Sequence, residues 1–298
     1  MNADIPIAEI QLRDPFVVVD AAARQYLLLG TTGFGEVAHG GFAVRTSRDL
    51  REWSESRTVL APAAGPVRVT HFWAPEVQAY RGRWYLFGTF THGSELHRPE
   101  RRYTRIYVAD TPEGPFAPLT SGPITPPGWW CIDGTLHVDV HGTPWLVFVR
   151  EWLQVHDGEI QAVELTPDLR GQAGGPRRLF RASEAPWSLP QTWEKFSGYR
   201  VTDGPWLHRL ASGVLLMLWS SFGQGGYLTG VARSANGEVT GPWVQSPKPL
   251  FAADGGHPML FRTFEGQLML ALHTPNVPDQ ERARFFPVRE TKDGLELA

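Results

Sequence analysis

The sequence predicts an all-β fold, a five-bladed β-propeller formed by residues 1–298 as one domain. The main observation is a pattern that occurs five times, in which a short polar motif precedes an apolar segment, a turn and a second apolar segment. Repetition of this kind indicates one supersecondary unit copied around an axis. The 31 glycines and 25 prolines supply turns for many short strands, and no extended helical pattern interrupts them.

Each repeat predicts a β-hairpin, because residues typical of strands flank a short turn. Four of the turns contain glycine, namely Gly82, Gly142, Gly213 and Gly266. In chain order, the hairpins are expected at residues 15–32, 77–90, 136–151, 206–222 and 259–273. The polar motifs in front of them read RDPF, WAPE, IDGT, TDGP and GGHP, at residues 13–16, 73–76, 132–135, 202–205 and 255–258.

A third strand follows each of the first four hairpins, and the corresponding segments span residues 40–53, 103–116, 158–169 and 227–243. The fifth blade lacks sequence for its outer strand, so either the N-terminal segment or the tail at residues 285–297 has to complete it. Residues 181–200 lengthen the third interval, and we expect them to form a loop over one rim of the propeller.

Composition excludes several function classes. The net charge of −3 gives no basic surface for a nucleic acid partner, and no stretch is apolar for long enough to span a membrane. The single cysteine, Cys131, excludes an intrachain disulfide. Residues 1–16 lack the basic and apolar regions of a signal peptide, which predicts a cytoplasmic location. A secreted protein trimmed of its signal peptide would show the same feature.

Three of the polar motifs place Asp14, Asp133 and Asp203 at the start of innermost strands, where the blades converge. Carboxylates around one mouth repel one another, which raises the pKa of at least one of them. Hydrolysis of a glycosidic bond needs one ionised group to activate water and one protonated group for the leaving oxygen. In inverting glycosidases these groups stand about 6.5–9.5 Å apart, a spacing that suits a propeller channel. Asp before Pro or Gly is also a common turn signature.

With RDPF, FWAPEV, IDGTLHVD, TDGP and GGH in this order, the chain resembles glycoside hydrolase family 43 from about residue 10 onward. Members of that family are five-bladed propellers that act on arabinose- and xylose-containing glycans. The resemblance implies that Asp14 is the general base, Asp133 positions the acid and tunes its pKa, and Asp203 is the acid. The family usually has Glu at this last position. Because Asp is one methylene shorter, Glu151 is the alternative acid and Glu194 a weaker one.

Further residues are candidates for binding the sugar. Phe72 and Trp73 flank the mouth of the second blade and are expected to stack on a sugar face. Arg282 resembles an arginine that reaches the sugar, although an ion pair with Glu281 is the alternative. Tyr199 and Trp193 in the long loop are expected near the leaving group, and Phe34 and His39 at the rim of the pocket.

The remaining hypotheses concern ions in the channel. His257 takes the channel position of the fifth blade, and the resemblance suggests a calcium ion near it, although calcium prefers oxygen ligands. Glu76 is expected to be structural, bonding the channel wall or a cation. No cofactor is required for the expected chemistry.

The sequence therefore predicts an inverting exo-glycosidase that acts on an oligosaccharide or a polysaccharide-derived substrate. An α-L-arabinofuranosidase is the first hypothesis, because TDGPWL, LLMLWSSF, DGGH and LHTPN resemble a branch of exo-acting furanosidases. A β-D-galactofuranosidase or a β-xylosidase is the near alternative, since an exocyclic carbon is discriminated only modestly. The Asp in TDGP leaves a non-catalytic glycan-binding propeller as another alternative, and a protein-interaction propeller as the third.

Overall fold

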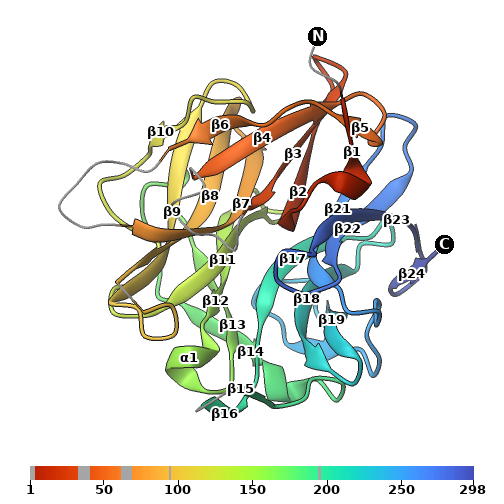
Figure 1. The fold of residues 1–298 in the computed structure, drawn as a ribbon. Helices are drawn as coiled ribbons and strands as arrows, with labels where there is room; N and C mark the ends of the chain where they lie inside the picture. Colours follow the sequence, from red (N-terminus) through yellow and green to blue (C-terminus); the bar gives the residue numbers. More distant parts are fainter. Residues whose placement is uncertain (1–3, 33–40, 62–68, 94, 194–195) are drawn as a thin grey trace.

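The computed structural model describes residues 4–32, 41–61, 69–93, 95–193 and 196–298, and it shows a five-bladed β-propeller (Figure 1). Each blade is a four-stranded antiparallel sheet whose strands are paired in the order of the chain. The predicted fold class is therefore confirmed. Phe34, His39 and Glu194 lie outside the described residues. No helix in the described part of the chain is long and apolar enough to cross a membrane.

Blades 1 and 2 follow the predicted order of strands. Blade 1 contains β2 (Arg13–Asp20), β3 (Gln25–Thr31), β4 (Phe42–Ser47) and β6 (Arg57–Leu60). Blade 2 contains β7 (Val69–Tyr80), β8 (Arg83–His92), β9 (Arg101–Ala109) and β10 (Ala117–Pro118). The turn between β7 and β8 consists of Arg81 and Gly82, both at positive φ (46° and 78°), as tight hairpins require.

The other three blades repeat this pattern. Blade 3 contains β11 (Cys131–Val138), β12 (Pro144–Arg150), β13 (Glu159–Glu164) and β14 (Arg177–Arg181). Blade 4 contains β17 (Asp203–Arg209), β18 (Leu215–Gly223), β19 (Gly226–Ser234) and β20 (Trp243–Gln245). Blade 5 contains β21 (Gly256–Arg262), β22 (Leu268–Thr274), β23 (Arg282–Glu290) and β24 (Leu295–Leu297).

In the described ranges of the chain, only short elements lie outside the blades. The strand β1 (Ile5–Pro6) pairs with β5 (Glu52–Trp53), and the predicted rim loop contains the hairpin of β15 (Gln191–Trp193) and β16 (Phe196–Tyr199). Helical elements among the described residues are α1 (Trp152–Val155) and the 3-10 turns η1 (Ile7–Glu9) and η4 (Ala182–Glu184).

The tail completes the fifth blade, which decides between the two predicted alternatives. Strand β24 pairs with β23, whereas the N-terminal segment joins blade 1 to blade 5 through a β-bridge between Gln11 and Arg282 at the start of β23. The backbone N–H of Leu12 donates to the carbonyl of Glu281 at 3.1 Å, and the fully buried Glu281 carboxylate accepts from Arg13 at 2.7 Å. The ring is therefore closed by a short segment that leads directly into β2.

Every innermost strand contains a β-bulge. The register shifts after the first paired residue of β2, β17 and β21, after the second paired residue of β11, and in the middle of β7. In each blade one bulge residue adopts a left-handed conformation, with φ between 46° and 57°, and these residues are Asp14, Ala74, Asp133, Gly204 and His257. Bulges re-aim side chains, and here they do so at the same point of all five blades.

Candidate active site

The prediction that Asp14, Asp133 and Asp203 occupy equivalent positions in their blades is wrong for Asp203. Asp14 and Asp133 occupy the left-handed position of their blades, and so does His257. In blade 4 that position belongs to Gly204, so Asp203 stands one residue earlier, where blade 1 has Arg13. The pattern of single motifs does not reveal this offset, because both residues of the Asp-Gly pair fit a turn.

One cavity of about 180 Å³ lies at these bulges, on the channel side of the blades. Strands of blades 1 to 5 contribute to its wall, together with α1. The lining residues are Arg13, Asp14, Trp73, Leu96, His97, Arg102, Ile132, Asp133, Glu151, Trp152, Leu153, Asp203, Tyr227 and His257. The structure thus brings together all four predicted catalytic carboxyl groups, Trp73 and His257.

Asp14 is buried at the base of the cavity among basic groups. Nδ1 of His257 lies 3.3 Å from its Oδ1, and Arg13 precedes it in the chain. Burial alone would raise the pKa of Asp14, but His257 and Arg13 outweigh it, and the pKa is lowered from its ordinary value. Asp14 is therefore ionised at neutral pH.

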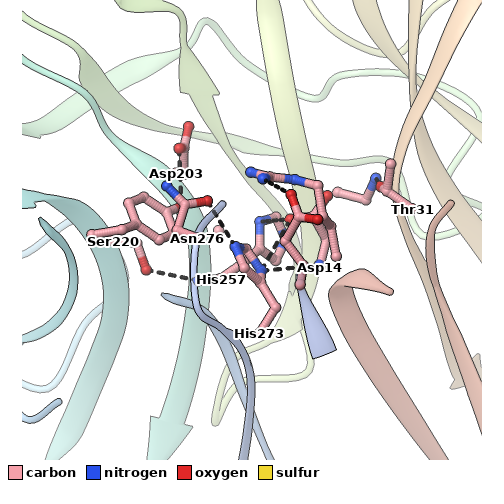
Figure 2. A network of polar contacts seen from close by, with 12 residues as sticks. Asp14, Thr31, Asp203, Ser220, His257, His273 and Asn276 are labelled. Atoms are coloured by element: carbon pink, nitrogen blue, oxygen red, sulfur yellow. Dashed lines mark hydrogen bonds and ion pairs between the residues drawn. The ribbon is translucent and has the colours of Figure 1, made fainter. Parts of the chain in front are cut away.

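His273 supports Asp14 from below, as a neutral ring. Its Nδ1 accepts the backbone N–H of Asp14 at 3.1 Å, and its Nε2 lies 3.1 Å from Oδ1 of Asn276 (Figure 2). Burial lowers the pKa of His273 to about 3, with Arg13 adding to the shift. The proton therefore sits on Nε2, and the approach of Nδ1 to Oδ1 of Asp14, 3.6 Å, is not an ion pair.

Asp133 is held at both its backbone and its carboxylate. Its N–H donates to Oγ1 of Thr89 at 2.9 Å, and its Oδ2 accepts the N–H of Gly204 at 2.9 Å. Nδ1 of His257 lies 3.9 Å from the same oxygen. Burial and the nearby charge of Asp14 raise the pKa of Asp133, while His257 and the Gly204 N–H oppose that shift.

Asp203 stands at the wall of the cavity with part of its surface open to solvent. Its Oδ2 accepts a hydrogen bond from the hydroxyl of Tyr227 at 2.9 Å. Burial raises the pKa of Asp203 well above its ordinary value, and the charge of Asp133 raises it further. The pKa values of Asp14 and Asp203 therefore shift in opposite directions although both residues line the same cavity, as the chemistry of an acid and a base requires.

Glu151 faces the cavity from the residue before α1. It is buried, and its Oε1 accepts a hydrogen bond from Nη1 of Arg102. The other nitrogens of this guanidinium are also bonded, with Nε donating to Oγ1 of Thr91 and Nη2 to the carbonyl of Leu96. Oε2 of Glu151 has no hydrogen-bond partner in the described residues. Burial raises the pKa of Glu151, while Arg102 opposes the shift.

Of the two aromatic residues predicted to stack on a sugar, Trp73 lies in the cavity wall and Phe72 does not. Trp73 lines the cavity and stacks on His71, with ring centroids 5.6 Å apart and planes 5° from parallel. Phe72 is buried in the core, where it packs edge-on against Phe42 and Phe90, so its predicted contact with a sugar is wrong. Alternation along β7 sends neighbouring side chains to opposite sides, which explains why only one of them reaches the cavity.

The structure does not place Arg282 or Tyr199 in the cavity wall. Arg282 donates to the backbone carbonyls of Ala8 and Glu281, so neither the sugar contact nor an ion pair with Glu281 carboxylate is seen. The arginines that line the cavity are Arg13 and Arg102. Tyr199 packs against Trp152, which does line it, with ring centroids 5.6 Å apart.

The donor groups do not fit the hypothesis of a calcium ion. No group of three His, Cys, Asp or Glu residues converges as a metal site in the part of the chain that the structure describes. His257 directs Nδ1 at Asp14, and an imidazole is a poor calcium ligand. Glu76 accepts a hydrogen bond from Gln78 at 2.9 Å, and burial raises its pKa to about 8.

Arg13, Arg102 and Tyr227 are the site residues that sequence reasoning missed. Arg13 had a signal, since it directly precedes Asp14 in the first motif. Tyr227 comes from β19 and Arg102 from β9, the third strands of their blades, which carry no recurring polar motif. Only the folded structure reveals that these two side chains reach the channel.

Comparisons with known proteins agree with this geometry. The family model of glycosyl hydrolases family 43 matches residues 3–292. No curated protein matches the chain. Among solved structures, an endo-arabinase from Bacteroides thetaiotaomicron VPI-5482 is 42% identical, with a TM-score of 0.87, over 98% of this chain and 99% of that one.

Two more distant structures share the architecture. An endo-1,4-beta-xylanase from Bacteroides thetaiotaomicron VPI-5482 is 25% identical, with a TM-score of 0.74, over 97% of this chain and 94% of its own. An alpha-L-arabinofuranosidase from Lactobacillus brevis is 18% identical, with a TM-score of 0.77, over 98% of this chain and 95% of its own. At this identity the similarity supports the fold and nothing further. Since the family model covers almost the whole chain, this protein belongs to glycosyl hydrolases family 43 and is a glycoside hydrolase.

Proposed function

We propose that this hydrolase cleaves α-L-arabinofuranosyl linkages with inversion, as an exo-acting α-L-arabinofuranosidase. The observation that carries the proposal is the opposite shift of two carboxyl groups in one cavity, with the pKa of Asp14 lowered and that of Asp203 raised. The 42% identity to an endo-arabinase supports arabinose as the sugar.

The reaction is a single displacement. Asp14, ionised, takes a proton from a water molecule as its oxygen forms a bond to the anomeric carbon. The bond between that carbon and the leaving oxygen breaks, and Asp203 gives its proton to the leaving oxygen. The products are the sugar hemiacetal of inverted configuration and the free hydroxyl of the leaving group. Asp14 ends protonated and Asp203 ionised, and exchange with water restores both.

Asp203 suits the role of acid better than Glu151 does. Tyr227 occupies Oδ2 of Asp203, which leaves Oδ1 to carry the transferable proton. Glu151 is committed to a buried ion pair with Arg102, and guanidinium stabilises the ionised carboxylate. We assign to Oε2 of Glu151 the acceptance of a hydrogen bond from a sugar hydroxyl.

An endo-acting arabinanase is the second candidate, favoured by the endo-arabinase with 42% identity. The exo mode rests on the resemblance of four motifs to exo-acting furanosidases. Both candidates use the same three aspartates, so the products of the reaction distinguish them.

The test is hydrolysis of linear arabinan and of p-nitrophenyl α-L-arabinofuranoside, β-D-galactofuranoside and β-D-xyloside. Release of arabinose alone supports the exo mode, and a ladder of oligosaccharides supports the endo mode. Proton NMR during the first turnovers identifies the anomer and should show inversion. Binding of arabinan without any product would overturn the proposal in favour of a glycan-binding module.

A further inference from the structure

Hydrogen bonds between neighbouring blades run around the channel at the level of the cavity. In four of the five junctions, a side chain on the second strand of one blade accepts the N–H of the left-handed residue of the next. The donor and acceptor pairs are Asp14 with His273 (3.1 Å), Ala74 with Thr31 (2.8 Å), Asp133 with Thr89 (2.9 Å) and His257 with Ser220 (2.9 Å). Figure 2 shows His273 below Asp14 and Ser220 beside His257.

The four acceptors occupy one structural position. Each is paired with the residue that precedes the left-handed residue of its own blade, as Trp73 is with Thr89 and Asp203 is with Ser220. In blade 3 the corresponding pair is Ile132 and Val149. Valine has no hydrogen-bond acceptor, so blade 3 cannot make the contact that the other blades make.

Val149 nevertheless faces the next blade, as the four acceptors do. It is fully buried and packs with Val147 in the cluster that contains Leu207 and Trp219 of blade 4. Phe148, the preceding residue of the strand, belongs to the cluster on the side of blade 2, as Leu146 does. The side chain therefore points toward the junction and fills it with methyl groups.

The fifth N–H of the series goes to the active site instead. The backbone N–H of Gly204 donates to Oδ2 of Asp133 at 2.9 Å. A side chain at 204 would collide with His257, since an added Cβ would lie 2.9 Å from the ring carbon Cγ, so the backbone alone occupies this place. Asp133 thus bridges blades 3 and 4 with its carboxylate.

We propose that Val149 is a positioning residue, which reserves the Gly204 N–H for the Asp133 carboxylate because it cannot accept that hydrogen bond itself. A threonine at this place would offer an oxygen where Thr31 and Thr89 offer theirs. The inference rests on the proposed role of Asp133, and its spectroscopic test is independent of any turnover.

The test compares Val149→Thr with Val149→Ala, which reduces the side chain without adding an acceptor. Glycine labelled with ¹⁵N makes the amide of Gly204 observable by NMR. In the wild type and in Val149→Ala, we expect the amide proton shift of Gly204 to follow the titration of Asp133. In Val149→Thr this dependence should disappear. An unchanged titration in Val149→Thr would overturn the proposal, whether or not the protein hydrolyses arabinan.

Kinetics give a second readout. Loss of a hydrogen bond to a charged group corresponds to a fall of about ten- to a hundredfold in kcat, with KM unchanged. The acidic limb of the pH profile should move to higher pH in Val149→Thr only, because Asp133 loses a donor that favours its ionised form. The other groups that act on Asp133 stay the same, and they are Arg13, Asp14, Glu76, Glu151, Asp203, Tyr227 and His257. Equal kinetics for Val149→Thr and Val149→Ala would contradict the proposal.

Discussion

At the scale of the residue, the environments of two carboxyl groups divide the chemistry between them. The interactions with His257 and Arg13 lower the pKa of Asp14 against the effect of burial, whereas burial and the charge of Asp133 raise the pKa of Asp203. Neither environment follows from the residue type, since an aspartate in water titrates near pH 4 in both cases. Burial and the charges of the neighbours together decide which carboxyl group has the higher pKa.

Replacing Asp14 by Asn should remove the base and spare the fold, since Asn tolerates the left-handed conformation at this position. We expect kcat/KM on arabino-oligosaccharides to fall about 10²- to 10⁴-fold. Calorimetry should show an unfolding temperature close to that of the wild type. Asp168→Asn, at an exposed turn, is the matched control and should leave both unchanged. Wild-type turnover in Asp14→Asn would exclude Asp14 as the base.

Replacing Asp203 by Asn should slow hydrolysis in proportion to how poor the leaving group is, because an activated leaving group needs no proton. The rate should fall about 10²- to 10⁴-fold on arabino-oligosaccharides and much less on a dinitrophenyl arabinofuranoside. Glu151→Gln is the comparison, and it should reduce the rate on both substrates by one common factor. The reverse pattern would make Glu151 the acid.

The pH profile of kcat/KM should be bell-shaped, because Asp14 and Asp133 must be ionised and Asp203 protonated. The charge of Asp133 raises the pKa of Asp203, after burial. Asp133→Asn removes that charge and lowers the pKa of Asp203, so the alkaline limb should move to lower pH. Residual activity measured across the pH range checks this. An alkaline limb that stays in place would show that Asp133 does not tune the acid.

At the scale of the element, each innermost strand contains a residue in the left-handed conformation, and in four of the five blades a hydrogen bond from a neighbouring blade holds that residue in place. A left-handed conformation at a residue other than glycine costs about 1–3 kcal/mol, and Asp14, Ala74, Asp133 and His257 all adopt it. Side chains of the preceding blades hold each of these residues by its N–H. The bulges thereby aim short side chains into the cavity at defined angles.

The start of β2 depends on a buried ion pair between Arg13 and Glu281. Glu281→Gln removes the charged hydrogen-bond partner of Arg13 at this junction, and we expect the free energy of unfolding to fall by about 3 kcal/mol. Glu113→Gln is the matched control at the exposed pair with Arg57, where the loss should stay below about 1 kcal/mol. Urea titration measures both. Equal losses would show that the buried pair does not stabilise the junction between blades 1 and 5.

At the scale of the whole molecule, the two ends of the chain have different tasks. The N-terminal segment runs along β23 and joins blade 5 to blade 1, and the C-terminal β24 adds the outer edge of blade 5 (Figure 1). Ile10 and Leu12 of the first segment are buried, whereas Leu297 of the last strand is 41% exposed. Closure of the ring therefore depends on the N-terminal segment.

Deletions should reveal this difference. A chain without residues 291–298 should remain folded and active, with a lower unfolding temperature. A chain without residues 1–12 loses the burial of Ile10 and Leu12, about 1.5–3 kcal/mol for each side chain, and the bond from Leu12 to Glu281. We expect it to unfold at lower denaturant concentration than the first. Circular dichroism during urea titration ranks the two, and the opposite order would contradict this account of closure.

The sequence by itself determined the five-bladed architecture, the hairpin turns and the position of Asp14 and Asp133. These features depend on local chemistry, such as strand propensity, the turn at Gly82 and a motif repeated at each blade. Local patterns also predicted that Trp73 and Glu151 belong near the site, and both line the cavity.

Only the tertiary structure decided which residues surround the aspartates. Tyr227 and Arg102 reach the cavity from third strands that carry no motif, and the tail rather than the N-terminal segment completes blade 5. Phe72 and Trp73 are neighbours in sequence but point to opposite sides of β7. The protonation of Asp203 depends on burial and on charges more than 20 residues away in the chain. Electrostatic energy is a function of distance in space, which a linear sequence does not contain.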